Sequence, residues 1–484
     1  MRSESSVAAV LTHRLPDGTR DAGWMRALAD HYGRMVELHP GEPLLVLFDI
    51  DGTILDMRHM VRYVLKAYDG THGTAYFRDL ELGAIRTHED SPEVLLDAHD
   101  LPSGTRQSVL RWYLRHRWSA DAIRASHRPF AGVMEVVRWF QIQPETFVGL
   151  NTGRPEWLRS ATLHSLNWLG EEYKVRFASE LLKMNPHGWN RQTAEAKAAA
   201  VEDFRREGYR VVAMIDNEPE NLRAVGEADP GGEILLLHAD TIFKTRRSEL
   251  PGVSVSGRTY ELSAVARRER LPTHVQFVWR GVETGDGLAS FLESNIRWAE
   301  IEVGADSRAG PVLLASDPAT AGSVEPLDLR VVLAALARRG RGVRVDLRNG
   351  EALLDLARCL AAAGLPPGDV WIHAPVDRIG PDGFRRLRDR LPGSLLQCPI
   401  DPVAGLIPDY PEQGREILER CRAMGVRRFS VQVGSLRLRE VLDRLSEWGY
   451  ESDVRGVRDL ESFLRTVLLL PTSVSATFRF PGWA

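Results

Sequence analysis

The chain has 484 residues, a length typical of two or three domains. Its hydrophobic share of 43% and charged share of 26% are those of an ordinary globular protein, and its net charge of −4 gives no general attraction to nucleic acids or anionic membranes. No signal-peptide-like segment opens the sequence, no run of eighteen uncharged apolar residues occurs, and Cys359, Cys398 and Cys421 lack the spacing of metal ligands. We therefore expect a cytoplasmic enzyme or binding protein without nucleic-acid or membrane partners.

Residues 1–43 are treated as an N-terminal extension, and from Leu44 onward apolar runs alternate with helical stretches. This alternation predicts a parallel α/β sheet. A mostly helical insert, roughly residues 57–130, is too long for a simple crossover and is expected to form a cap. The polar segment 244–272 marks the boundary of this domain, which spans 44–268. The predicted strands are 44–49, 146–152, 175–179, 210–216 and 233–239.

A second series of strand-like runs fills residues 271–484 and alternates with helical segments. About eight strand–helix units predict a β/α barrel of the TIM type. The fold class is therefore α/β throughout, a parallel sheet followed by a barrel. The runs are 274–281, 299–304, 311–316, 342–348, 369–376, 394–400, 427–434 and 473–480.

The first predicted strand ends in the sequence DIDGT, with two aspartates separated by one residue. Asp49 and Asp51 point the same way because side chains alternate along a strand. Their mutual repulsion is relieved by a divalent cation, and ligands bind at the carboxyl ends of strands in open α/β sheets. An Asp-Gly turn would need only one of these carboxylates. The motif therefore predicts a metal-dependent site.

Two other predicted strands end in polar residues that would reach the same edge of the sheet. The sequence NTGRP supplies Thr152 as a hydroxyl donor and Gly153 where a backbone approaches a ligand closely. Arg154 could clamp a substrate phosphate or cap the following helix. The fourth strand ends in Asp216.

The motifs DIDGT, NTGRP, a lysine and IDNEPEN, in this order, resemble the haloacid dehalogenase-like (HAD) phosphatase superfamily over residues 44–239. The resemblance implies a Rossmann-like sheet, a Mg²⁺ cofactor and a small phosphorylated substrate. It implies that Asp49 is the nucleophile that forms an aspartyl-phosphate, and that Asp51 is the general acid. Thr152 and Lys197 would hold the phosphoryl group, while Asp216 would bind Mg²⁺ with Asp49 and the carbonyl of Asp51.

Two positions leave alternatives open. The lysine is Lys197, which precedes Asp216 by a family-like interval, or Lys183, and the chain has only five lysines among its 62 basic residues. The second acidic residue expected in the fourth motif is replaced by Asn217 at the adjacent position, so Glu220, four residues after Asp216, is the candidate metal ligand.

The barrel segment resembles glycerophosphodiester phosphodiesterase-like barrels, and more closely their menorin-type relatives. Arg280 and Gly281 match an early His-Arg-Gly motif, but Trp279 replaces its histidine and Ser316 stands where a second histidine is expected. Glu300 and Glu302 occupy the carboxylate pair. Diester cleavage needs proton-transfer groups that Trp and Ser do not supply, so we expect a degenerate barrel used for binding.

The carboxylates of the barrel have two interpretations. Glu300, Glu302 and Asp346 could bind a cation, or they could pair inside the barrel with Arg280, Arg344 or Arg348. His373 on a later strand is interpreted as a hydrogen-bonded core histidine.

The expected function is a Mg²⁺-dependent phosphomonoester hydrolase fused to this barrel. Alternatives are a phosphotransferase, a two-step diesterase–monoesterase, and a non-catalytic scaffold that recognises a phosphorylated ligand.

Overall fold

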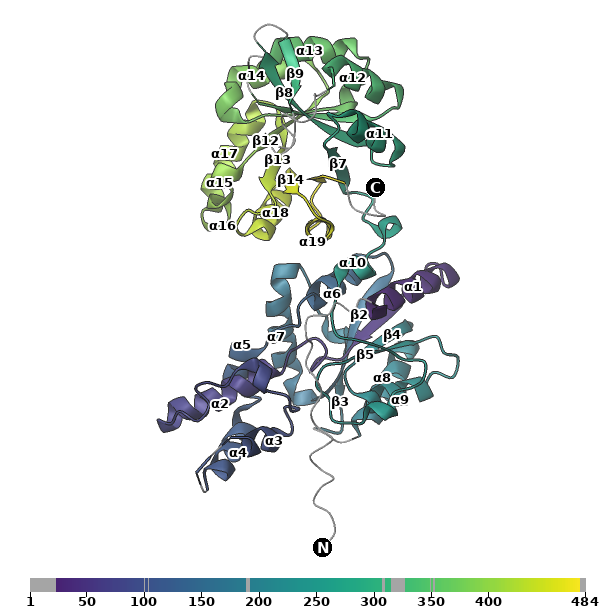
Figure 1. Cartoon of the computed structure of the whole chain (residues 1–484), viewed down its shortest axis with the longest axis vertical. Coiled ribbons are helices and arrows are strands. Elements are labelled where there is room, and N and C mark those ends of the chain that lie inside the picture. The colour runs from purple at the N-terminus through teal and green to yellow at the C-terminus, as the bar shows by residue number, and fades with distance from the viewer. Residues whose placement is uncertain are drawn as a thin grey trace. The chain divides into compact units, whose positions relative to one another are not determined.

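The computed structural model describes residues 23–99, 101–102, 104–188, 192–306, 310–314, 327–348, 350 and 353–478. The chain divides into two compact units, Met1–Arg270 and Leu271–Ala484 (Figure 1). No helix within the described ranges is long and apolar enough to cross a membrane.

The first unit is built on a six-stranded parallel sheet with the strand order β3-β2-β1-β4-β5-β6. Its strands are β1 (Leu44–Phe48), β2 (Thr146–Pro155), β3 (Leu182–Asn185), β4 (Arg210–Asp216), β5 (Leu235–Ala239) and β6 (Val255–Gly257). Its helices are α1 (Gly23–Leu38), α2 (Arg58–His72), α3 (Pro92–Asp97), α4 (Thr105–His116), α5 (Ala120–Ser126), α6 (Val133–Gln141), α7 (Arg159–Gly170), α8 (Thr193–Arg206), α9 (Pro219–Glu227) and α10 (Leu262–Val265). Helices α2 to α5 form the insert between β1 and β2 (Figure 1).

The central strand β1 is buried along its whole length, as expected for a strand covered on both faces. Leu45 and Leu47 pack in one cluster with Phe204 of α8 and Leu222 of α9. Helix α1, which falls in the segment assigned to an extension, also packs on this unit, because Tyr32 Oη lies 2.7 Å from the hydroxyl of Thr146 in β2.

The predicted third strand at 175–179 is wrong, and the strand at this edge is β3 at 182–185. The backbone of Phe177 bonds to a side chain instead of a neighbouring strand. Its N–H donates to Oδ1 of Asn167 (2.7 Å), and its carbonyl accepts from Nδ2 of the same residue (3.1 Å). The run therefore buries Val175 and Phe177 without joining the sheet.

The second unit is a closed barrel of eight parallel strands, in which β10 pairs with both β8 and β11. The barrel strands are β7 (Gln276–Arg280), β8 (Trp298–Asp306), β10 (Gly342–Leu347), β11 (Val370–His373), β12 (Leu395–Pro399), β13 (Val426–Gln432), β14 (Glu451–Val457) and β15 (Ser473–Ala476). The helices are α11 (Gly285–Glu293), α12 (Leu329–Arg338), α13 (Leu353–Ala362), α14 (Val376–Arg390), α15 (Asp401–Ala404), α16 (Leu406–Asp409), α17 (Pro411–Ala423), α18 (Leu438–Glu447) and α19 (Leu460–Leu468).

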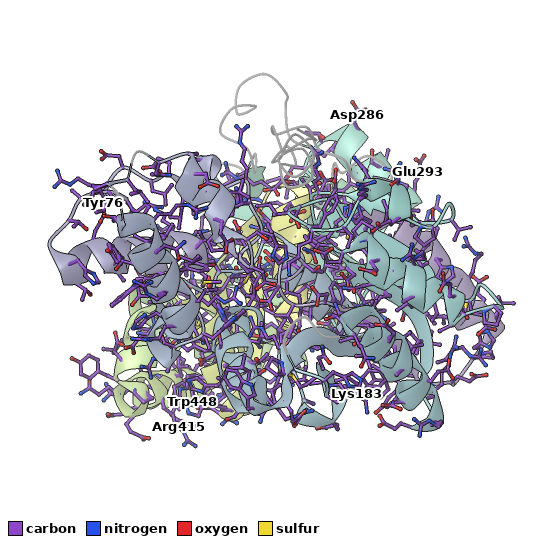
Figure 2. All side chains as sticks on the ribbon, turned by 90° about the horizontal axis from the view of Figure 1, so that it is seen from below. Tyr76, Lys183, Asp286, Glu293, Arg415 and Trp448 are labelled. Carbon is purple, nitrogen blue, oxygen red and sulfur yellow. The ribbon has the colours of Figure 1, made fainter. Side chains whose placement is uncertain are left out.

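The predicted fold class is confirmed, but one of the eight predicted barrel strands is wrong. The run 311–316 corresponds to β9 (Gly310–Leu314), which pairs antiparallel with β8 and lies outside the barrel closure. The eighth strand of the barrel is instead β14, which lies in none of the predicted runs. The helices around the barrel are amphipathic, as in α11, where Leu288 and Phe291 are buried while Asp286 and Glu293 project outward (Figure 2).

Candidate active site

Three neighbouring strands of the first unit bring the predicted catalytic residues to one edge of the sheet. β1 lies between β2 and β4 and runs parallel to both. Asp49 follows β1 directly, Thr152 lies near the end of β2, and Asp216 is the last residue of β4. The order of the strands therefore explains why motifs more than a hundred residues apart in the chain meet.

Lys197, from the first turns of α8, joins the two buried aspartates. Its Nζ lies 2.7 Å from Oδ1 of Asp49 and 2.5 Å from Oδ2 of Asp216. Asn151 fixes the helix at this point, because its Nδ2 donates to the carbonyl of Lys197 (3.0 Å). The other candidate, Lys183, instead pairs with Glu207 away from the aspartates. Of the two lysines left open by the sequence, Lys197 is the one in contact with Asp49.

Burial and neighbouring charges shift the pKa values of Asp49 and Lys197. Burial, together with the neighbouring carboxylates of Asp216 and Asp51, raises the pKa of Asp49 to about 7, against the opposing effect of Lys197. Burial alone would lower the pKa of Lys197, but the carboxylates of Asp216 and Asp49 raise it above its ordinary value. The lysine is therefore a permanent cation between two carboxylates.

Arg154 holds Asp51, the second aspartate of the first motif. Its Nε donates to Oδ2 (2.8 Å) and its Nη2 donates to Oδ1 (2.6 Å) in a bidentate pair. Thr162 accepts a further bond from Nη1 (3.0 Å), and the Trp118 ring lies 4.8 Å from the guanidinium carbon. The Arg154 side chain is fully buried. In this geometry it holds Asp51, and it is not among the described residues that line the cavity beside Asp49.

The NTGRP turn is compact. The hydroxyl of Thr152 accepts from the N–H of Arg154 (3.2 Å), and Thr152 is itself buried. Gly153 lines the cavity, where a Cβ would approach a methyl carbon of Thr193 to 3.0 Å. A side chain at this position would therefore crowd the start of α8, and the close approach of a ligand to Gly153 stays a prediction.

The fourth motif surrounds Asp216 with donors. The N–H of Glu218 donates to Oδ1 (2.8 Å), and Nδ2 of Asn221 lies 3.2 Å from both carboxylate oxygens. Asn217 donates to the carbonyl of Ile242 (2.6 Å). The Glu220 side chain is half exposed and 3.8 Å from Arg223. Asn221, five residues after Asp216, is thus the side chain of this motif that contacts it, a residue that the sequence analysis did not single out.

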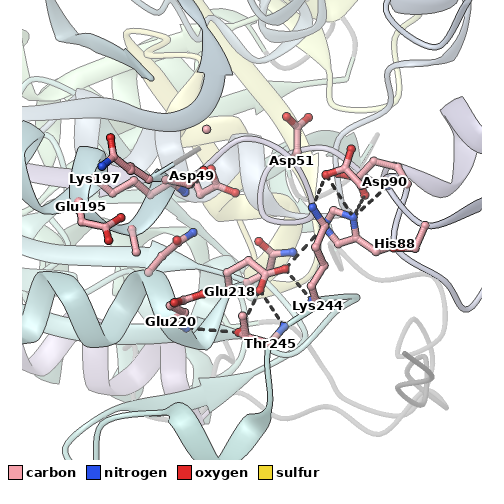
Figure 3. A pocket seen from close by; sticks show the side chains of 18 residues that line it. Asp49, Asp51, His88, Asp90, Glu195, Lys197, Glu218, Glu220, Lys244 and Thr245 are labelled. Carbon is pink, nitrogen blue, oxygen red and sulfur yellow. Dashed lines mark hydrogen bonds and ion pairs between the residues drawn. The ribbon is translucent and has the colours of Figure 1, made fainter. Parts of the chain in front are cut away.

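A cavity of about 570 Å³ opens onto these residues and is closed on another side by the cap (Figure 3). The cap contributes His88, Glu89 and Asp90 from the loop before α3, and the core adds Glu218 and Lys244. Burial, followed by the nearby charge of Lys244, lowers the pKa of His88 to about 3, so its ring is neutral at pH 7. Sequence reasoning missed this group. The signals available were the polar run THED in the cap and the scarcity of lysine.

The barrel carboxylates are engaged by arginines that lie on or directly after neighbouring strands. Glu300 lies 3.2 Å from Nη1 of Arg344, and Glu302 lies 2.6 Å from Nε of Arg348. Arg280 lies 3.7 Å from Glu300 and 3.8 Å from Glu302. Of the two interpretations of these carboxylates, ion pairing inside the barrel describes the contacts.

Asp346 and His373 belong to a hydrogen-bonded chain in the barrel. Nδ1 of His373 lies 2.9 Å from Oδ1 of Asp346, and its Nε2 lies 2.7 Å from the hydroxyl of Ser430. Both ring nitrogens are therefore satisfied, as expected for a core histidine. Trp279 is buried against Phe291 and Phe478. Ser316 lies outside the described residues.

No protein-family model and no curated protein matches the sequence. Solved structures do share a likeness with it. A phosphodiesterase from Oleispira antarctica, in complex with the product sn-glycerol-3-phosphate, is 15% identical, with 43% of this chain and 94% of that chain covered and a TM-score of 0.33. A glycerophosphodiester phosphodiesterase from Agrobacterium tumefaciens is 11% identical, with 42% and 96% covered and a TM-score of 0.31.

A haloacid dehalogenase-like hydrolase from Streptococcus pneumoniae is 13% identical, with 43% of this chain and 89% of that chain covered and a TM-score of 0.28. The solved structures that resemble the chain thus include phosphodiesterases and a haloacid dehalogenase-like hydrolase. At such low identities the chemistry of this chain has to follow from its own side chains.

Proposed function

We propose that the first unit is a Mg²⁺-dependent phosphomonoester hydrolase that works through an aspartyl-phosphate on Asp49, and that the barrel serves for binding. One observation carries the proposal. A buried lysine contacts two buried strand-end aspartates, and a separate aspartate held by a buried arginine lines the same cavity as the lysine and the first of them. These are a nucleophile, a cation, a metal ligand and a proton donor in one place.

The donor set fits a hard divalent cation. Asp49 and Asp216 offer carboxylate oxygens at one point, and the crowding of negative charge that raises the pKa of Asp49 is what such a cation would relieve. Asp49, Asp216 and the carbonyl of Asp51 would hold Mg²⁺, with Glu220 a further candidate near the cavity wall. When bound, Mg²⁺ would neutralise the charge on the phosphoryl oxygens.

The reaction follows in two displacements. An oxygen of Asp49 forms a bond to phosphorus while the bond from phosphorus to the leaving oxygen breaks, and Asp51 gives that oxygen its proton. Water then attacks the phosphorus, Asp51 takes the proton of the water, and the bond to Asp49 breaks, which releases inorganic phosphate. Lys197 balances negative charge throughout, and Arg154 keeps Asp51 oriented between the two steps.

The test is phosphate release by Asp49→Asn with Mg²⁺ and a panel of phosphomonoesters. The substitution preserves shape but removes the attacking charge, so turnover is expected to fall by several orders of magnitude. Asp240→Asn is the matched control, because Asp240 is also buried at a strand end but pairs with Arg258 (2.7 Å). Near-normal Mg²⁺-dependent turnover by Asp49→Asn would exclude Asp49 as the nucleophile.

A further inference from the structure

The loop of the cap that lines the cavity carries three titratable side chains, which bear on the leaving group of the substrate. The side-chain donor atoms of His88, Glu89 and Asp90 all lie within 4.8 Å of one another. They belong to the cap, whereas Glu218, Lys244 and Thr245 come from the core. We call this group the cap-side wall. In Figure 3, His88 and Asp90 lie on the far side of Asp51 from Asp49, while Glu218, Lys244 and Thr245 lie below them.

The leaving group of the proposed reaction faces the cap-side wall. In a phosphoryl transfer the attacking and leaving oxygens are roughly in line, so the leaving group lies opposite Asp49. It must also lie beside Asp51, which protonates it. Asp51 lines the same cavity as His88, Glu89 and Asp90, and Figure 3 shows it beside Asp90.

The carboxylates of the cap-side wall are fixed in place. Glu218 accepts from the N–H groups of Lys244 (2.7 Å) and Thr245 (3.1 Å) and from the Thr245 hydroxyl (3.0 Å). The N–H of Asp90 donates to Nδ1 of His88 (3.1 Å), so the proton of this neutral ring is on Nε2, 3.6 Å from Glu218. The wall therefore presents acceptors whose own positions are already determined.

The cations near this wall are already matched by carboxylates. Lys244 pairs with Asp90, and Arg117 donates to the same carboxylate (2.5 Å) and to the carbonyl of Glu89 (3.0 Å). Lys197 is engaged by the two catalytic aspartates. Burial raises the pKa of Glu89 well above its usual range, so Glu89 is not counted as a negative charge. Among the described residues that line the cavity, the cations are Lys197 and Lys244, and both are already paired. A second anionic group on the substrate would therefore meet Asp90 or Glu218 without a described cation to pair with, and like charges brought together cost several kcal/mol.

The described residues that line the cavity also include no large apolar side chain of the kind that usually holds a hydrophobic ligand. Among the residues described as lining it, Gly153 and Ala194 are those without a polar side chain, and neither offers a large apolar group. An aromatic or aliphatic leaving group would gain little by binding here, while a hydroxyl or ammonium group can donate to the acceptors of the wall.

We infer that the substrate is a phosphate monoester of a small hydrophilic alcohol that carries hydrogen-bond donors and no second negative charge, such as a polyol or an amino alcohol. This inference rests on the proposed phosphatase function. The cap-side wall determines which leaving groups bind. Lys244 is already paired with Asp90 and therefore does not attract an anionic group on the substrate.

The experiment compares four alkyl phosphates with the full-length protein and Mg²⁺: sn-glycerol 3-phosphate, phosphoethanolamine, 3-phosphoglycerate and benzyl phosphate. The first and third differ by one carboxylate in place of a hydroxymethyl group. We expect kcat/KM for sn-glycerol 3-phosphate or phosphoethanolamine to exceed that for 3-phosphoglycerate by about 100-fold, the rate equivalent of the cost of one like-charge contact. Benzyl phosphate should also be poor. The comparison of sn-glycerol 3-phosphate with phosphoethanolamine shows whether a hydroxyl or an ammonium donor is preferred.

Two substitutions test the role of the cap-side wall in opposite directions. The measured quantity is the ratio of kcat/KM for sn-glycerol 3-phosphate to kcat/KM for 3-phosphoglycerate. Asp90→Asn leaves Lys244 and Arg117 without this carboxylate and should lower the ratio by about tenfold or more, whereas Lys244→Met should raise it. The ratio of two substrates is unaffected by a loss of folded protein. Preferred hydrolysis of 3-phosphoglycerate or benzyl phosphate by the wild type, or an unchanged ratio in both variants, would overturn the inference and leave the phosphatase proposal standing. Absence of turnover on every substrate would overturn both.

Discussion

Substituting Arg154 by methionine tests whether this arginine acts through Asp51 or on the substrate. The two bonds from Arg154 to Asp51 (2.8 and 2.6 Å) are charge-assisted, each contributing about 1.5–3 kcal/mol, and both partners are largely removed from water. Without them Asp51 is no longer held in one orientation. Because a positioned general acid accelerates a reaction by about 10²–10⁴, we expect kcat to fall by about 10² in Arg154→Met.

The assay is a double-mutant cycle with Asp51→Asn, followed by phosphate release. If Arg154 acts only by positioning Asp51, Arg154→Met should reduce kcat little further in the Asp51→Asn background, and KM should change less than kcat. Arg159→Met serves as the matched control, because Arg159 lies on the same segment but pairs with the exposed Glu156 (2.5 Å). Additive losses, or a KM increase with weaker inhibition by inorganic phosphate, would refute the positioning role and indicate a phosphate clamp.

Three further predictions follow from other contacts. Lys197→Met should lower phosphate release by about 10³ or more and reduce stability by about 3–5 kcal/mol, because it leaves two buried carboxylates without their cation, whereas Lys183→Met should change either quantity little. Equal effects of the two substitutions would contradict this. Burial, then Arg154, lowers the pKa of His127 from 6.5 to about 3. The unfolded chain takes up the proton first, so stability should fall by about 1.4 kcal/mol per pH unit between pH 6.5 and 3, and His127→Gln should reduce that slope in chemical denaturation. Because Glu300, Glu302 and Asp346 are engaged by arginines and His373, the full-length Asp49→Asn protein should not cleave glycerophosphodiesters with Ca²⁺, Mg²⁺ or Mn²⁺; metal-dependent cleavage abolished by Glu300→Gln would reverse this interpretation.

The sequence was most informative where a local pattern and a strand end coincide. β4 was predicted with its observed bounds, because its run is uniformly apolar up to Asp216. β14 was missed because a buried acid interrupts its pattern. Asp453 is fully buried, where it lies 3.2 Å from Arg344 and accepts from Ser473 (2.5 Å). A strand whose inward side chains form ion pairs does not have the apolar character that marks a strand in a sequence.

The candidate site likewise contains residues that could be predicted from the sequence and contacts that could not. Asp49, Asp51, Lys197 and Asp216 were predicted together because the carboxyl ends of parallel strands meet at one edge. The bond from Arg154 to Asp51 could not be predicted, because it depends on how the turn after β2 folds back on β1. The cap-side wall depends on the placement of an inserted loop over the sheet, which no periodicity in the sequence encodes.

The contacts between cap and core at the cavity have a consequence for turnover. They include one ion pair, Lys244 with Asp90, and the neutral ring of His88 facing Glu218, and the side chains of the ion pair are 31% and 11% exposed. Dissolved ions weaken a partly exposed ion pair less than a fully exposed one but more than a buried one, since the screening length is about 8 Å at physiological ionic strength and about 3 Å at 1 M. If these pairs hold the cap over the product, added salt should speed the release of phosphate and alcohol while the buried Asp49 is screened much less. The proposed enzyme would then be salt-activated in kcat whenever release limits its rate, a dependence opposite to that of an enzyme which attracts its substrate by long-range charge.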